Sequence, residues 1–172
     1  MSRKIALVLA VLAVSLSYGC KPPNGSGDPL EITANVEASE DSFSPIPLLA
    51  YSITLNMKAL REVEYSEVNV LLVNKNGDML PNVSVYPSPK QLDKGEEDSM
   101  NCFIPLPLEM SDWLDKVNLI VNFTGRDDIA ARFVQLPSYT ELNRSKYGMD
   151  FALQPMRGKT SFDREGNINQ SQ

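Results

Sequence analysis

Few residues in this chain could act as a nucleophile, a general base or a metal ligand. The sequence contains two cysteines, Cys20 and Cys102, and no histidine. Without histidine the chain cannot form a Ser-His-Asp or Cys-His catalytic group or a zinc site that uses imidazole. Two cysteines are also too few for a four-cysteine zinc site. We therefore expect no metal and no cofactor, and we predict that the protein is not an enzyme.

Carboxylates are the remaining groups that could bind a cation or cleave a bond. The acidic segment Asp93–Ser99 resembles the oxygen-rich loops that bind calcium, but its spacing does not follow the calcium-loop pattern and Lys94 dilutes its charge. We expect a solvated loop there. A hydrolase that uses two carboxylates stays open, because such chemistry needs only two positioned acids.

The aromatic residues do not indicate a sugar-binding groove, because the six tyrosines are scattered along the chain. The single tryptophan, Trp113, could anchor a protein partner, since tryptophan is enriched among residues that dominate binding energies at interfaces. The alternative, which is the more common role, is a position in the core or in a turn between strands.

Cys102 lies on the apolar phase of an alternating segment, beside Met100 and Ile104. A cysteine in that setting is typical of a buried, unreactive packing residue. A disulfide between Cys20 and Cys102 stays open if Cys20 carries no other modification.

The N-terminus has the layout of an export signal. Arg3 and Lys4 precede the apolar run Ile5–Leu16, which is too short to cross a hydrocarbon core that needs roughly 20 residues. Ser17-Tyr18-Gly19 then leads to Cys20, followed by a segment rich in Pro, Gly and Ser. We predict a signal peptide over residues 1–19 and a flexible tether over residues 20–29. An ordinary secretory peptide with an incidental cysteine is the alternative.

A small residue followed directly by cysteine, here Gly19-Cys20 after an apolar run, resembles the end of the signal in bacterial lipoprotein precursors. The resemblance covers the first 20 residues. It implies transfer of a diacylglyceryl group to the Cys20 thiol, cleavage before Cys20, and acylation of the new amino group. Lys21 stands where an aspartate would imply retention in the inner membrane, so the resemblance favours the outer membrane.

Charge excludes some classes of partner. The 172-residue chain has a net charge of −6, and removal of residues 1–19 would take away Arg3 and Lys4 and leave −8. Nucleic acids and anionic membrane surfaces attract basic faces that this composition hardly supplies. We therefore expect no nucleic-acid partner.

Hydrophobic alternation from residue 30 onward predicts a series of short strands. The turn chemistry of Asn74–Asp78 predicts a hairpin between two of them. Pro105 and Pro107 fall on one phase of their segment and delete backbone donors on one side only, which predicts an edge strand. The expected strands span residues 30–38, 49–57, 68–73, 79–86, 100–108, 117–123, 129–136 and 151–153.

Helical signals are sparse. Ser138 and Glu141 form a capping-box pattern and Gly148 suits a C-terminal cap, which predicts one short helix over residues 139–147. Ser111–Lys116 could form a single capped turn. We predict an all-β antiparallel β-sandwich over residues 30–155, with an immunoglobulin-like or transthyretin-like layout, and a disordered tail over residues 156–172.

These features favour a non-enzymatic lipoprotein of the bacterial cell envelope, anchored through Cys20, that presents a β-sandwich to an envelope protein partner. A surface module that binds a glycan or a cation is the first alternative. The carboxylate-dependent hydrolase is the second.

Overall fold

Two long paired strands, in which apolar and polar residues alternate, lie at the centre of the fold. The computed structural model describes residues 27–41, 48–80, 83–85, 89–107, 109–156, 159–162 and 168–171. In it, β1 spans Leu30–Asp41 and β2 spans Leu48–Ala59. Successive strand residues point to opposite faces, so every second side chain along most of these strands is buried. The pairing is antiparallel and runs from one end of both strands to the other.

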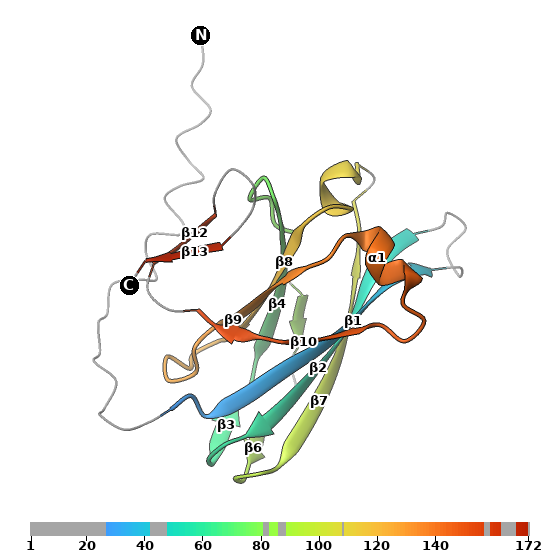
Figure 1. Ribbon diagram of the computed structural model, residues 1–172. Coiled ribbons are helices and arrows are strands. Elements are labelled where there is room, and N and C mark those ends of the chain that lie inside the picture. Colours follow the sequence, from blue (N-terminus) through green and yellow to red (C-terminus); the bar gives the residue numbers. More distant parts are fainter. Residues whose placement is uncertain are drawn as a thin grey trace.

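Two shorter strands complete a four-stranded antiparallel sheet around this pair (Figure 1). β7, spanning Glu97–Pro105, pairs with β2, and β10, spanning Met149–Ala152, pairs with β1. The order across the sheet is β10-β1-β2-β7.

A five-stranded sheet packs against the first, in the order β11-β9-β8-β4-β5. Its pairings are antiparallel as well. The five strands are β4 (Val68–Asn74), β5 (Val83–Val85), β8 (Val117–Phe123), β9 (Arg132–Leu136) and β11 (Gln154–Pro155).

One hydrophobic cluster fills the space between the two sheets. It combines Ile53 and Leu55 of the four-stranded sheet with Val70 and Leu119 of the five-stranded sheet, each of them 0% exposed. The predicted all-β, antiparallel fold with a sandwich-like arrangement is therefore confirmed at this level.

Most predicted strands form, with shifted ends. The predicted hairpin is present: β4 pairs with β5, and Asn74 at its turn accepts hydrogen bonds on its side-chain oxygen from the backbone N–H groups of Asn76 and Asp78, both at 2.9 Å. β9 begins at Arg132 and not at residue 129, because Ile129 donates its N–H to Arg126 in a turn (3.1 Å).

Two small ladders were not predicted. β3 (Val63–Tyr65) pairs with β6 (Lys90–Leu92) at one end of the sandwich. β12 (Lys159–Phe162) pairs with β13 (Ile168–Ser171), so the prediction of a disordered tail is wrong for these residues. The tail contains too few apolar residues for a core of its own, and the high β-propensity of Thr160, Phe162 and Ile168 is the one signal that could have indicated strands there.

The helices are shorter than predicted. α1 spans Tyr139–Arg144 and has the predicted capping box between Ser138 and Glu141. It ends at a cap on Ser145, so Gly148 does not terminate it. Gly148 has φ +74° and packs so closely on Asn35 that a Cβ there would lie 2.4 Å from the Asn35 side-chain oxygen. The turn at Ser111–Trp113 is one 3₁₀ turn, η1, without a side-chain cap.

Pro105, the last residue of β7, lies at the free edge of the four-stranded sheet, as predicted, and Pro107 follows two residues after it. Leu106 donates its N–H to Leu49 at 2.8 Å, so the even-numbered donors of this segment face β2. Pro105 and Pro107 have the opposite phase, where a donor would face away from the sheet. The edge-strand prediction is confirmed.

A buried arginine links the two sheets where the start of β1 meets β9, and we call this contact region the seam. Arg132 on β9 is 3% exposed and forms an ion pair with Asp28, just before β1. Its guanidinium also donates to the carbonyls of Leu30 (2.9 Å) and Ala130 (2.8 Å). On the same side, the chain leaves β10 and enters β11 after Leu153, and so passes from one sheet to the other.

Residues 1–26, which include the predicted signal peptide and Cys20, lie outside the described residues. Within the part of the chain that the structure describes, no helix has the length and apolarity needed to cross a membrane.

We expect Asp28→Ala to lower the free energy of unfolding by about 1–3 kcal/mol, because it leaves a buried guanidinium without its counter-charge. Urea denaturation of a chain that begins at residue 21 measures this. Asp127→Ala removes an exposed carboxylate and serves as the control, with an expected change within about 0.5 kcal/mol. Equal effects of the two substitutions would contradict a structural role for the ion pair.

Candidate functional site: a polar groove on the four-stranded sheet

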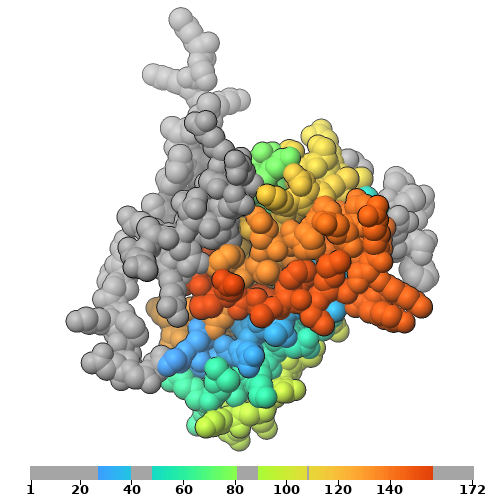
Figure 2. Space-filling model, in the orientation of Figure 1, coloured from blue at the N-terminus to red at the C-terminus, as the bar shows by residue number. Residues whose placement is uncertain are grey.

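A groove of about 660 Å³ runs over the outward face of the four-stranded sheet, near the start of β1. Figure 2 shows this side of the molecule, with the blue, teal and yellow-green surfaces of β1, β2 and β7 next to one another. We call it the polar groove. Its lining residues are Glu31, Thr33, Asn56, Met57, Lys58, Glu97, Asp98 and Ser99.

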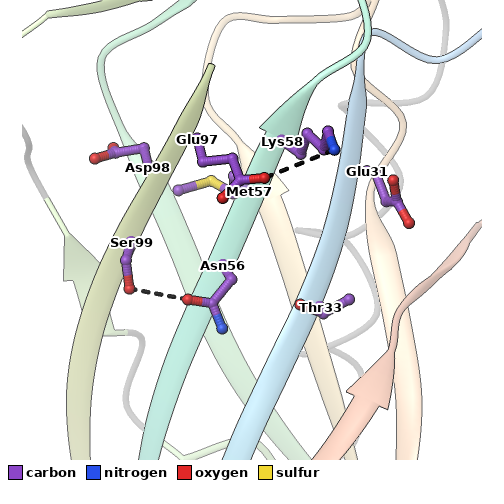
Figure 3. A pocket seen from close by; sticks show the side chains of 8 residues that line it. All are labelled: Glu31, Thr33, Asn56, Met57, Lys58, Glu97, Asp98 and Ser99. Carbon is purple, nitrogen blue, oxygen red and sulfur yellow. Dashed lines mark hydrogen bonds and ion pairs between the residues drawn. The ribbon is translucent and has the colours of Figure 1, made fainter. Parts of the chain in front are cut away.

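The antiparallel register places the side chains of the polar groove in two rows across three strands (Figure 3). Glu31, Lys58 and Glu97 form the first row, in which Lys58 Nζ lies 3.7 Å from Glu97 Oε1. The second row is neutral and consists of Thr33, Asn56 and Ser99.

A hydrogen bond fixes part of the neutral row. The Ser99 hydroxyl donates to the Asn56 side-chain oxygen at 3.1 Å. This leaves the Asn56 amide group directed over the sheet, beside the Thr33 hydroxyl. The polar groove therefore offers donors and acceptors at fixed positions on a rigid sheet, which suits a polar ligand.

Asp98 stabilises β7 beside the polar groove through hydrogen bonds on the opposite face of the strand. Its side chain points to the opposite face from Glu97 and Ser99 and accepts hydrogen bonds from the Tyr65 hydroxyl (2.7 Å) and from Lys90 (3.0 Å). Partial burial by itself would raise the pKa of Asp98, but these two hydrogen bonds outweigh it and hold the pKa below its usual value. Burial, together with the bond to Asp98, raises the pKa of Tyr65.

The expectation of a solvated loop over Asp93–Ser99 is wrong for its last three residues, because Glu97, Asp98 and Ser99 belong to β7 and line the polar groove, whereas Asp93 lies in the turn before that strand. Asp93 instead closes the turn, because its N–H donates to Glu96 at 2.8 Å. The residues from β1 and β2 were missed by sequence reasoning, since their place beside β7 depends on strand register. Their outward phase was visible in the alternation, but it did not indicate which strands are neighbours.

The geometry offers little for carboxylate chemistry. Glu31 and Glu97 stand on strands that flank β2, with Lys58 between them. The Glu97 side chain is 71% exposed, whereas a general acid usually needs a dry environment that keeps it protonated. Among the described residues, no group of three or more potential ligands is arranged to hold a metal ion.

Cys102 is a buried packing residue, as predicted. It is 8% exposed, and its thiol points to the carbonyl of Ile53 at 3.6 Å. Burial raises the pKa of the Cys102 thiol to about 11, so little reactive thiolate exists near neutral pH.

Trp113 also belongs to the core, which favours the structural role over the partner anchor. It is 6% exposed, and its carbonyl accepts a hydrogen bond from the Tyr51 hydroxyl at 2.9 Å. Tyr51 in turn packs edge-on against Tyr139, with ring centroids 5.8 Å apart. A partner could not reach the indole without opening this cluster.

No protein-family model and no curated protein sequence matches this chain.

We expect Asp98→Asn to lower the free energy of unfolding by about 1–2 kcal/mol at pH 7, because the hydrogen bonds to Tyr65 and Lys90 lose their charged acceptor. A carboxylate with a lowered pKa stabilises the fold above its unfolded pKa of about 4, and this contribution disappears as the pH falls through the folded pKa. The difference between wild type and variant should therefore shrink between pH 5 and pH 3.

Urea denaturation at both pH values measures this difference. Glu97→Gln is the control, since it neutralises the adjacent but largely exposed carboxylate and should cost no more than about 0.5 kcal/mol. A difference for Asp98→Asn that stays constant down to pH 3 would contradict the assigned role.

Proposed function

We propose that this protein is a non-enzymatic lipoprotein of the bacterial cell envelope. Lipid on Cys20 would hold it in the membrane, and the sandwich-like domain would bind another envelope protein. The absence of aspartate after Cys20 supports the outer membrane as its location.

The observation that carries the proposal is the position of Cys20 in the sequence, directly after an export-type apolar run. The sequence Ser17-Tyr18-Gly19-Cys20-Lys21 follows an export-type apolar run. Among the described residues, the first with a side-chain contact to the domain is Asp28, eight residues after Cys20. An acylated Cys20 would therefore stand eight residues before Asp28 in the sequence. Because a single acyl chain binds membranes only marginally and two or more hold firmly, a triacylated cysteine suits a permanent anchor.

For the layout of the domain we propose an immunoglobulin-like or transthyretin-like sandwich. Two antiparallel sheets over one core support it.

The polar groove favours a second candidate function, a surface module that binds a glycan. Its volume lies within the range of small-molecule sites, and the second row offers neutral hydrogen-bonding groups. Thermal unfolding with and without a panel of oligosaccharides tests this candidate, since a ligand that binds only the folded state raises its stability. Lack of any shift would count against it.

We expect wild-type protein to stay with the membrane through high-salt and alkaline washes, and Cys20→Ala protein to be released. The reason is that acyl chains and not surface charges would hold the protein. Immunoblots of the washed membranes and of the supernatants measure the distribution.

Cys102→Ala is the matched control, because it removes the other cysteine from a buried site and should stay with the membrane. Release of the wild type by the alkaline wash would contradict the lipid anchor.

A further inference from the structure

The outward face of the four-stranded sheet carries a block of neutral polar side chains that is larger than the polar groove. The block consists of two rows across β1, β2 and β7, which lie about 7 Å apart because alternate residues of a strand are separated by two rises of about 3.4 Å. We call it the neutral strip. Its first row, which belongs to the polar groove, is Thr33, Asn56 and Ser99, and its second row is Asn35, Thr54 and Asn101.

Both rows of the neutral strip have the same hydrogen-bonding arrangement. In the first row the Ser99 hydroxyl donates to Asn56 Oδ1 at 3.1 Å (Figure 3). In the second row the Thr54 hydroxyl donates to Asn101 Oδ1 at 2.7 Å. The Nδ2 atoms of Asn56 and Asn101 have no hydrogen-bond partner among the described residues. Each row therefore presents an amide that can donate next to a hydroxyl oxygen that can accept.

Aromatic residues border the neutral strip on two sides. Phe103 follows Asn101 on the outward phase of β7 and is 47% exposed. Tyr147, in the loop before β10, is 76% exposed, and its carbonyl accepts a hydrogen bond from the Asn35 side chain at 3.3 Å. Among the residues whose burial the structure describes, these are the two most exposed aromatic residues. The structure thus brings polar rows and exposed aromatic residues together on one face.

We infer that the neutral strip, with Phe103 at its β7 edge, binds a neutral oligosaccharide. This inference rests on the glycan-binding candidate function, and it assigns to that function a class of sugar and the residues that hold it. Ring hydroxyls of the sugar bond to the amides of Asn56 and Asn101 and to the neighbouring hydroxyl oxygens. The C–H face of one sugar ring lies on the Phe103 side chain.

The paired donors and acceptors match the chemistry of a sugar. A hydroxyl group donates one hydrogen bond and accepts others, so two adjacent ring hydroxyls require a donor and an acceptor side by side. The Asn101 amide and the Thr54 hydroxyl oxygen form one such pair, and Asn56 and Ser99 form the second. Because their own hydrogen bonds already fix these side chains on a sheet, they lose little conformational freedom when a ligand binds.

Phe103 supplies the apolar contact that such a ligand also requires. A sugar ring has C–H groups on its faces as well as hydroxyls on its rim, and ligand sites combine aromatic surface with a few placed polar groups. The residue opposite Phe103 on β2 is Ser52, so no apolar cross-strand neighbour covers the ring. The aromatic face is therefore available beside the second row of the neutral strip.

Charge favours a neutral sugar over an acidic one. Lys58 is the one basic residue on the outward phase of β1, β2 and β7, and it already lies 3.7 Å from Glu97. Glu31 and Glu37 flank the neutral strip along β1. A uronate or a phosphorylated sugar would lie near these carboxylates without a cation of its own, and like charges repel each other.

Binding to an array of immobilised glycans tests the inference. The array includes neutral oligomers of hexoses and of N-acetylhexosamines, and oligomers that contain uronates or sialic acid. Full-length protein is extracted from membranes in a detergent without a sugar headgroup, since a glycoside detergent would compete for the neutral strip. Isothermal titration calorimetry with the neutral oligomer that binds best then gives a dissociation constant for wild type and variants.

We expect Asn101→Ala and Phe103→Ala each to weaken binding of that neutral oligomer at least about fivefold, because one removes two amide donors and the other the apolar face. Phe103→Tyr keeps the ring and should bind within about twofold of wild type. Asn143→Ala and Met79→Ala are the matched controls, since they remove an exposed amide and an exposed apolar side chain outside the neutral strip and should not change binding.

Thermal unfolding of every variant separates lost binding from lost folding. The replaced side chains are exposed, so all variants should unfold close to wild type. Neutral-sugar binding that neither Asn101→Ala nor Phe103→Ala weakens would overturn the inference and leave the glycan-binding candidate in place. Binding of acidic glycans alone would have the same consequence.

A protein that binds no glycan of the array would overturn both the inference and the glycan-binding candidate function. The proposed lipid anchor is independent of that result, because it is tested by the release of Cys20→Ala protein from membranes.

Discussion

The ion pair between Arg132 and Asp28 is the contact on which the closure of this fold depends. It lies where the two sheets meet, and Arg132 also satisfies the carbonyls of Leu30 and Ala130. A guanidinium placed there would be strongly unfavourable without a counter-charge and acceptors, because a buried charge loses its hydration. Asp28 provides the counter-charge, and the carbonyls of Leu30 and Ala130 are the acceptors, so the contacts of Arg132 couple the start of β1 to β9.

Hydrophobic burial supplies the main driving force around this seam. Both sheets direct their apolar side chains into one core, and two tyrosine hydroxyls at its margin are hydrogen-bonded, Tyr51 to the carbonyl of Trp113 and Tyr65 to Asp98. The side chains that line the two rows of the polar groove lie on the opposite face of β1, β2 and β7 and do not pack into this core. Polar residues can therefore occupy these positions without burying a polar group in the core.

Local patterns made the strands, the hairpin at Asn74, the capping box at Ser138 and the edge role of Pro105 and Pro107 predictable, because each depends on neighbours in the sequence. The polar groove and the Arg132 seam depend instead on residues about 25 to 100 positions apart, whose contacts follow from register and sheet packing. A lone arginine in β9 gave no signal that it would be buried. The β12–β13 hairpin was missed because polar composition outweighed the β-propensity of a few residues in the prediction.

The central claim of this account is that Cys20 carries the lipid that holds the protein in the membrane. The most direct measurement is the intact mass of the protein extracted from membranes, compared with that of the Cys20→Ala variant. We predict a wild-type mass equal to residues 20–172 plus acyl chains, and no such addition in the variant. A wild-type protein without acyl chains would contradict the account and would make the protein a secreted or periplasmic β-domain instead.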